Sequence, residues 1–209
     1  MLLSSAYLPP VWYFSKLVSC DGREVRIEQY DHYLKQTYRN RCNIVGSLGV
    51  QSLTIPVEKG DDAKTLMRDV RVSEHGNWRH LHWNALSSAY SGTPFFLYYE
   101  DDFRKFYEHP VRFLFDFNLQ LTELLCRLAG IQPVLKPTDS FQPVGTPEEG
   151  DFREVIHPKR DYSLDASFRP VPYYQVFGKK HGFVPNLSMV DLLFNMGPES
   201  ILVLHESSC

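Results

Sequence analysis

The stretch that decides the fold is LLSSAYLPPVWYFSKLVSCDGREVRIEQY, residues 2–30. LLSSAYL suits a short strand, and Pro10 can occupy the first turn of a following helix, VWYFSKLVS. Asp21-Gly22 is a turn signal, after which REVRIEQY alternates polar and apolar residues as a strand does. A strand, a helix and a second strand in this order favour parallel pairing and an α/β fold.

Similar patterns outline the rest of the chain. A glycine-bearing loop between two β-prone runs predicts a hairpin over residues 42–57. Residues 58–67 are polar and predict an exposed loop. Short strands are expected at 69–74 and 200–207, and helices at 77–92, at 93–108 and, as the longest, from Pro110 to Gly130.

Length and composition favour one domain over residues 1–209, with a central sheet and covering helices. Hydrophobic residues make up 43% of the chain, so a sizeable core can form. Between residues 132 and 172, prolines, charges and turn residues crowd together. This pattern predicts an irregular, loop-rich stretch of the same domain, with a further helix starting within 173–178.

The charge and the cysteines argue against several classes of protein. The net charge is −3 and the basic residues are scattered, so nucleic acid is not an expected partner. No apolar run is long enough to span a bilayer, and the first residues lack the pattern of a signal peptide. We therefore expect a cytoplasmic protein. The cysteines are isolated from one another, so neither a metal site nor a redox cofactor is expected: Cys20, Cys42, Cys126 and Cys209.

The stretch HGFVPNLSMVDLLFNMGPES, residues 181–200, contains several helix start and stop signals. Ser188 and Asp191 have the spacing of a capping box, and Gly197 suits a left-handed helix exit. A short helix over 189–196 explains these three residues.

The helix signals do not explain four other residues of this stretch, which stay candidates for a binding loop: His181, Pro185, Asn186 and Asn195.

Two other groups of polar residues have a structural and a functional interpretation. Lys35 with Tyr38-Arg39-Asn40-Arg41 can hold a phosphate or carboxylate, or can be the charged edge of a strand. His80 and His82 would diverge by about 200° on a helix, so they do not predict a shared metal. His82 falls on the apolar stripe of that helix, where it is either a core residue or a buried site histidine.

The ordered set of short blocks along the chain resembles the WbqC-like protein family. The blocks are AYLPPVWYFSKL, KQTYRNRCNI, LTIPV, NWRHLHW, YYQVFGKKHGFVPNLSMVDLLFN and GPES. The chain departs from the family pattern at Ser4, Ser5 and Ala6, where members commonly carry His-Gln-Pro. The residues that match are Tyr7, Pro9, Lys35, Asn40, Arg41, Trp78, His82, Trp83, His181, Pro185 and Asn186.

The resemblance implies a bacterial transferase of surface-polysaccharide (O-antigen) precursor synthesis. Such an enzyme would transfer an aminoacyl group such as glycyl to a nucleotide-linked amino sugar. Arg41 and Lys35 would hold phosphate, and His82 or His181 would act as general base. Asn40 and Asn186 would orient the substrate, and Tyr7 and Trp78 complete the predicted binding site.

Two alternatives follow from the same residues. Loss of the His-Gln pair suggests a non-catalytic protein that binds sugar nucleotides in the same pathway. A structural partner of a glycosyltransferase is the third hypothesis, and it requires an exposed apolar patch of several hundred Å².

Overall fold

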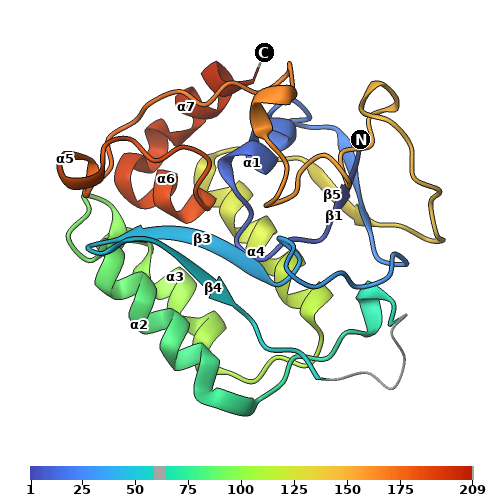
Figure 1. Cartoon of the computed structure of the whole chain (residues 1–209), viewed down its shortest axis with the longest axis horizontal. Coiled ribbons are helices and arrows are strands. Elements are labelled where there is room, and N and C mark those ends of the chain that lie inside the picture. The colour runs from blue at the N-terminus through green and yellow to red at the C-terminus, as the bar shows by residue number, and fades with distance from the viewer. Residues whose placement is uncertain (59–64, 209) are drawn as a thin grey trace.

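The computed structural model describes residues 1–58 and 65–208 and confirms the α/β prediction (Figure 1). The strands are β1 (Leu2–Ser4), β2 (Glu24–Glu28), β3 (Arg41–Gly46), β4 (Gly49–Thr54) and β5 (Val134–Pro137). The helices are α1 (Val11–Val18), α2 (Trp78–Tyr90), α3 (Phe96–Glu108), α4 (Leu114–Ala129), α5 (Gly178–His181), α6 (Met189–Met196) and α7 (Ser200–Ser207). Single 3₁₀ turns occur at η1 (Met67–Asp69), η2 (His75–Asn77), η3 (Pro147–Glu149), η4 (Tyr162–Leu164) and η5 (Gly197–Glu199).

The opening segment forms the sheet that the sequence predicts. Strands β1, β2 and β5 lie side by side in that order, and both pairs are parallel. Ser4 pairs with Glu28, and Ile27 pairs with Pro137, so the three strands end together. Parallel strands need crossover connections, and α1 supplies the one between β1 and β2.

The predicted hairpin is also present, as a separate two-stranded sheet. Strands β3 and β4 pair in antiparallel register from Arg41 with Thr54 to Gly46 with Gly49. Helices α2 and α6 both pack against β3. The hairpin therefore lies between helices rather than extending the parallel sheet (Figure 1).

Helix α6 is the hub of the core. It packs against α1, α2, α3, α4 and α7, and the Phe194 ring contacts the rings of Tyr90, Phe96 and Phe103. Gly197 ends α6 with a positive φ of 56°, as predicted, but its ψ of −131° lies outside the predicted left-handed helical region. A Cβ at this position would lie 2.5 Å from the Phe95 ring, so only glycine fits.

The last expected strand is wrong, because residues 200–207 form α7. Ser200, Val203, Leu204 and Ser207 are buried, which is the i, i+3, i+4, i+7 pattern of a helix face. The 3₁₀ turn η5 leads directly into this helix. The β-branched residues of the segment suggested a strand, but the tertiary packing of this face determines a helix.

Four further expectations about helices, strands and loops differ from the structure. Residues 69–74 form no strand, because only single bridges join Val72 to Val57 and Arg71 to Phe113. Those contacts keep residues 110–113 extended, so α4 starts at Leu114. The loop-rich stretch 132–172 contains β5, and the helix expected within 173–178 begins at its last residue, Gly178. The polar loop expected at 58–67 falls largely on residues 59–64, outside the described residues.

The start of α6 uses only half of the predicted capping box. The Ser188 hydroxyl accepts a hydrogen bond from the Val190 N–H at 3.4 Å. Asp191 instead points into the core, where the Tyr173 hydroxyl and the Gln175 amide donate to its Oδ2 at 2.7 and 2.9 Å. Burial raises the pKa of the Asp191 carboxyl to about 6, although the Tyr173 hydrogen bond opposes this shift. Asp191 therefore joins the segment before α5 to α6. Its buried negative charge lowers the stability of the folded state.

Replacing Asp191 with Asn is expected to stabilise the protein at pH 8. A carboxyl pKa that is raised on folding means that the folded state loses stability as pH rises from about 4 towards 6 and above. The shift from 3.8 to about 6 corresponds to roughly 3 kcal/mol at high pH. Asn keeps an acceptor for Tyr173 and carries no charge.

Urea unfolding of both proteins between pH 4 and pH 8 measures this difference. The stability of Asp191→Asn relative to wild type should grow with pH and vanish near pH 4. A variant that is equally destabilised at every pH would contradict this interpretation of the buried carboxylate.

Candidate functional site

Polar side chains gather where the three parallel strands end. Ser4 ends β1, Glu28 ends β2, and Thr138 directly follows β5. Ligands of open α/β sheets bind at the carboxyl ends of the strands. The segment after β5, gold to orange in Figure 1, contributes Asp151 and Arg153 to this edge.

Arg153 joins that segment to the sheet. Its side chain is fully buried and forms ion pairs with Asp151 at 2.7 Å, with Asp31 at 3.1 Å and with Glu28 at 3.5 Å. The carbonyls of Gln142 and Pro143 accept two further bonds at 3.0 and 2.8 Å. A guanidinium with this many partners is a structural anchor and is not available to a ligand.

Glu28 is equally committed to structure. Its carboxylate is buried and accepts hydrogen bonds from the Tyr30 N–H at 2.7 Å and the Thr138 hydroxyl at 3.0 Å. The Gln142 N–H donates a third bond at 3.1 Å. Glu28 therefore fixes the start of the long loop after β5.

Arg39 is the least engaged charged group of this edge. Its side chain is only 5% exposed, yet its one ion pair among the described residues is with Asp31, at the long distance of 3.5 Å. Burial lowers the pKa of the guanidinium, and the Asp31 charge opposes this shift. A buried arginine with such weak pairing has capacity to bind an anion.

Asp31 lies between the two arginines. Burial raises the pKa of its carboxyl, the Arg153 and Arg39 charges lower it, and the nearby Glu28 charge raises it again. A carboxyl whose pKa is raised by burial is a better base than an exposed one, because its charged form is less stabilised. Asp31 is therefore the group at this edge that is best suited to move a proton.

A small cavity of about 10 Å³ lies between these groups and the end of β1. That volume is close to the space one water molecule needs, so a larger ligand requires an opening. The buried Ser4 hydroxyl has no hydrogen-bond partner among the described residues. The lining residues are Leu3, Ser4, Ser5, Ala6, Tyr13, Thr37, Tyr38, Arg39, Phe152, Arg153, Ile156 and His157.

The outer side of the cavity is basic. Lys159 donates to the Gln36 side chain at 3.2 Å, which joins the 157–160 loop to the turn that carries Lys35. Burial lowers the pKa of His157, and so do the charges of Arg39, Lys159 and Arg160, against the opposing effect of Glu154. An anion that approaches here meets positive charge.

Three of the residues predicted from sequence come together, but in the core. The Tyr7 hydroxyl lies 2.9 Å from His82 Nδ1 and 2.9 Å from the Tyr107 hydroxyl. Trp78 packs edge-on against the His82 ring with centroids 5.2 Å apart. Burial lowers the pKa of His82 to about 4, so the imidazole is neutral at pH 7.

The predicted asparagines both hydrogen-bond to the backbone. Asn40 donates to the Ile55 carbonyl at 2.9 Å. Asn186, at φ 55°, accepts from the Trp12 N–H at 3.0 Å and so satisfies a free donor at the start of α1. Both contacts are structural, whatever else these side chains do.

The predicted charged residues lie apart from one another. Arg41 contacts the Thr54 hydroxyl at 3.2 Å on the exposed face of the hairpin. His181 Nε2 lies 3.2 Å from the Gly46 carbonyl at the hairpin tip. Lys35 is exposed and lies two residues before Thr37, which lines the cavity. The structure therefore does not gather the predicted residues into one site.

Sequence reasoning missed the groups that do converge. Arg39 lay within the recognised basic cluster, but its neighbour Arg41 was assigned the phosphate role. Glu28 ends a predicted strand, which was a usable signal for the sheet edge. Asp31, Asp151 and Arg153 gave no signal, because only the folded loop brings them together.

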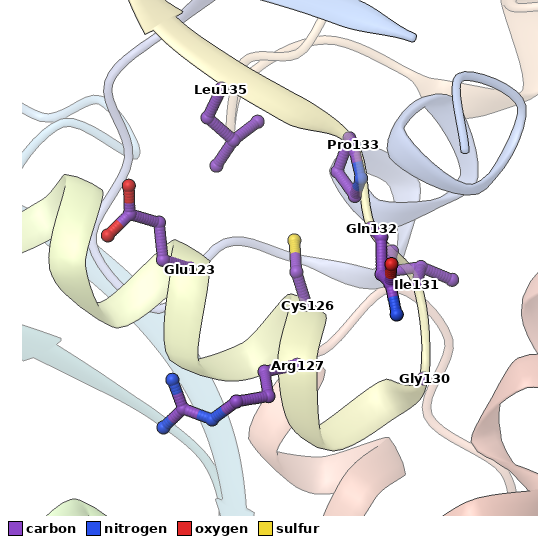
Figure 2. A pocket seen from close by; sticks show the side chains of 8 residues that line it. All are labelled: Glu123, Cys126, Arg127, Gly130, Ile131, Gln132, Pro133 and Leu135. Atoms are coloured by element: carbon purple, nitrogen blue, oxygen red, sulfur yellow. The ribbon is translucent and has the colours of Figure 1, made fainter. Parts of the chain in front are cut away.

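The other cavities have weaker chemistry. One of about 370 Å³ lies beside the end of α4 and the start of β5 (Figure 2). Burial raises the pKa of its Cys126 thiol to about 12, so no thiolate forms there at neutral pH. A second, of about 550 Å³, is lined by five carboxylates and lies against α1.

No group of three or more potential metal ligands occurs within residues 1–58 and 65–208. Over the same residues, no helix is both long and apolar enough to cross a bilayer.

Removing the Arg153 anchor is expected to cost about 3–5 kcal/mol of stability, because it leaves buried carboxylates unpaired. Arg153→Met tests this by urea unfolding at pH 7. Arg127→Met, at an exposed position of α4, is the matched control and should change stability by about 0.5 kcal/mol or less. Equal effects of the two substitutions would show that the cluster does not hold the fold together.

Comparison with known proteins places the chain among relatives. The model of the WbqC-like protein family matches residues 4–156. The chain is 26% identical over 223 residues to the uncharacterised protein Rv1507c of Mycobacterium tuberculosis, an alignment that covers 95% of this chain and 94% of that protein. No solved structure matches.

Proposed function

Starting from a chain that belongs to the WbqC-like protein family, we propose that it is a transferase of surface-polysaccharide precursor synthesis. In this proposal it transfers an aminoacyl group such as glycyl to a nucleotide-linked amino sugar. The observation that carries the proposal is Arg39, a buried arginine with one long ion pair beside the cavity at the end of the parallel sheet. A phosphate fits the planar fork of such a guanidinium.

The phosphate position follows from the charges around the cavity. Arg39 lines the cavity, Lys159 lies near the lining residue His157, and Lys35 lies in the adjoining turn, next to the Gln36 that Lys159 contacts. Arg41, the predicted phosphate ligand, lies on the hairpin and contacts Thr54. We therefore assign to Arg39 the role that the sequence suggested for Arg41, and keep Lys35 in it.

Substrate entry requires the 157–160 loop to move. The cavity of about 10 Å³ has room for about one water molecule, and Arg153 anchors the segment on the inner side of that loop. On its outer side, the loop is joined to the turn at residues 35–36 by the Lys159–Gln36 hydrogen bond. An exposed hydrogen bond of this kind contributes little to stability, so binding energy can replace it.

The chemical step needs a base for the sugar amine. The neutral amine attacks the acyl carbon, the bond to the donor's leaving group breaks, and the amine loses a proton. Asp31 takes this proton in our proposal, because its pKa is raised and it lies beside Arg39. His82 is buried in the core beside Tyr7, where burial lowers its pKa to about 4, and His181 remains the second candidate at the hairpin tip.

One observation favours a non-catalytic sugar-nucleotide binding protein instead. Ser4, Ser5 and Ala6 line the cavity at the position where the family commonly carries His-Gln-Pro. A histidine at one of these positions would place a general base beside the cavity, and this chain has no histidine there. The accessory protein of this alternative would bind the ligand at Arg39 without turning it over.

Arg39→Gln is expected to weaken binding of a nucleoside-diphosphate amino sugar by about 10- to 100-fold, the size of a charge-assisted hydrogen bond. Isothermal titration calorimetry measures the loss. Arg41→Gln is the matched control, because it removes the same charge two residues away on the exposed hairpin. If only Arg41→Gln weakened the binding of the amino sugar, the phosphate site would lie on the hairpin.

Asp31→Asn is expected to lower kcat by at least about 100-fold with little change in binding, as for loss of a general base. Mass spectrometry of the amino sugar under multiple turnover measures acyl transfer. Asp116→Asn, at an exposed position of α4, is the control. Full activity of Asp31→Asn with loss in His181→Ala would make His181 the base, and binding without any mass shift in wild type would support the accessory protein.

A further inference from the structure

A groove of about 640 Å³ lies between α3 and the start of α4, and none of its lining residues lines the cavity beside Arg39. This volume is in the range of sites for small organic ligands. Its lining residues are Lys105, Phe106, His109, Pro110, Val111, Arg112, Phe113, Asp116, Phe117 and Gln120.

The floor of the groove is apolar and fixed in place. Phe117 is buried and contacts the Phe106 ring with centroids 6.0 Å apart. The backbone of Arg112 and Leu114 is bonded to Val72 and Val70 at 3.0 Å each, which holds the connecting wall extended. The groove is therefore formed before any ligand arrives, and ordering it costs a ligand little.

The rim of the groove is mainly basic. Lys105, His109 and Arg112 lie on it, against one acid, Asp116. Lys105 is partly neutralised by Asp102 at 3.3 Å. The Arg112 guanidinium lies 5.0 Å from the centroid of the Phe113 ring and forms no ion pair with any described residue. The ring contact holds this cation at the edge of an apolar surface.

We propose that this groove binds a small amphiphilic anion. An alkyl or aryl body lies on Phe113, Val111 and Phe117, and a carboxylate or sulfonate head pairs with Arg112. Uncharged apolar ligands would leave Arg112 unpaired, and strongly polar anions would leave the apolar floor exposed to water. The inference stands apart from the proposed function, because it uses none of the residues around Arg39.

The probe is 8-anilinonaphthalene-1-sulfonate, an aryl anion whose fluorescence rises in apolar sites. The folded wild-type protein should bind it with one-to-one stoichiometry. Arg112→Gln should weaken this binding about tenfold through loss of a charge-assisted contact. The uncharged analogue N-phenyl-1-naphthylamine should bind both proteins equally.

Arg127→Gln is the matched control, since it removes an exposed arginine at the other end of α4. Its affinity for the sulfonate should equal that of wild type. Equal affinities of wild type and Arg112→Gln would overturn the proposal, and so would equal weakening by the two substitutions. Circular dichroism melts of each variant show that the compared proteins are folded.

A competition experiment on unmodified protein gives a second test. Decanoate should displace the bound sulfonate at a concentration about tenfold lower than decanol does, because only decanoate pairs with Arg112. Equal displacement by the two compounds would show a merely apolar groove and overturn the assignment of an anion. Neither result depends on whether the chain binds sugar nucleotides.

Discussion

The fully buried Arg153 is the constraint on which the site depends. Its ion pairs with Asp151, Asp31 and Glu28 join the irregular segment after β5 to the end of the parallel sheet. Burying so many charges is tolerable only because nearly every donor of the guanidinium has an acceptor. Arg153 partly neutralises the three carboxylates, and Arg39 is left with spare hydrogen-bonding capacity.

The same arrangement divides the molecule into a rigid part and an adjustable part. Arg153 and Glu28 fix residues 142–153 from within, whereas Lys159 holds the outer loop through one hydrogen bond to Gln36. Helix α6 stabilises the core through its aromatic contacts, and Asp191 joins this helix to Tyr173 before α5. In the proposed function, only the loop beside Arg39 moves to admit a ligand, and the sheet that positions the polar groups stays in place.

Much of the fold could be predicted from the sequence, because its signals are local. The Pro10 helix start, the Asp21-Gly22 turn and the glycine-bearing hairpin loop each act over a few residues. The last helix could not be predicted, since its β-branched residues favour a strand and only packing against α1 and α6 reveals the helical face. Strand β5 was missed because it is short and carries a Pro at its end.

The site was less predictable, for a physical reason. Tyr7 and His82 matched the family pattern, but the structure places them in one buried hydrogen-bonded cluster. Asp31, Arg39 and Arg153 are separated by up to 122 residues and meet only in the folded chain. The spacing of residues along a sequence predicts helices, strands and helix caps. Whether distant charged residues come together depends on how a long loop folds back onto the sheet.

The central claim is that Arg39 and the loop over it form a phosphate site. A crystal structure of the protein with a bound nucleoside-diphosphate amino sugar tests it most directly. The diphosphate should lie on the Arg39 guanidinium, between residues 4–6 and a displaced 157–160 loop, with Arg153 unmoved. A diphosphate bound at the hairpin near Arg41 and His181, with the loop still closed over Arg39, would contradict it.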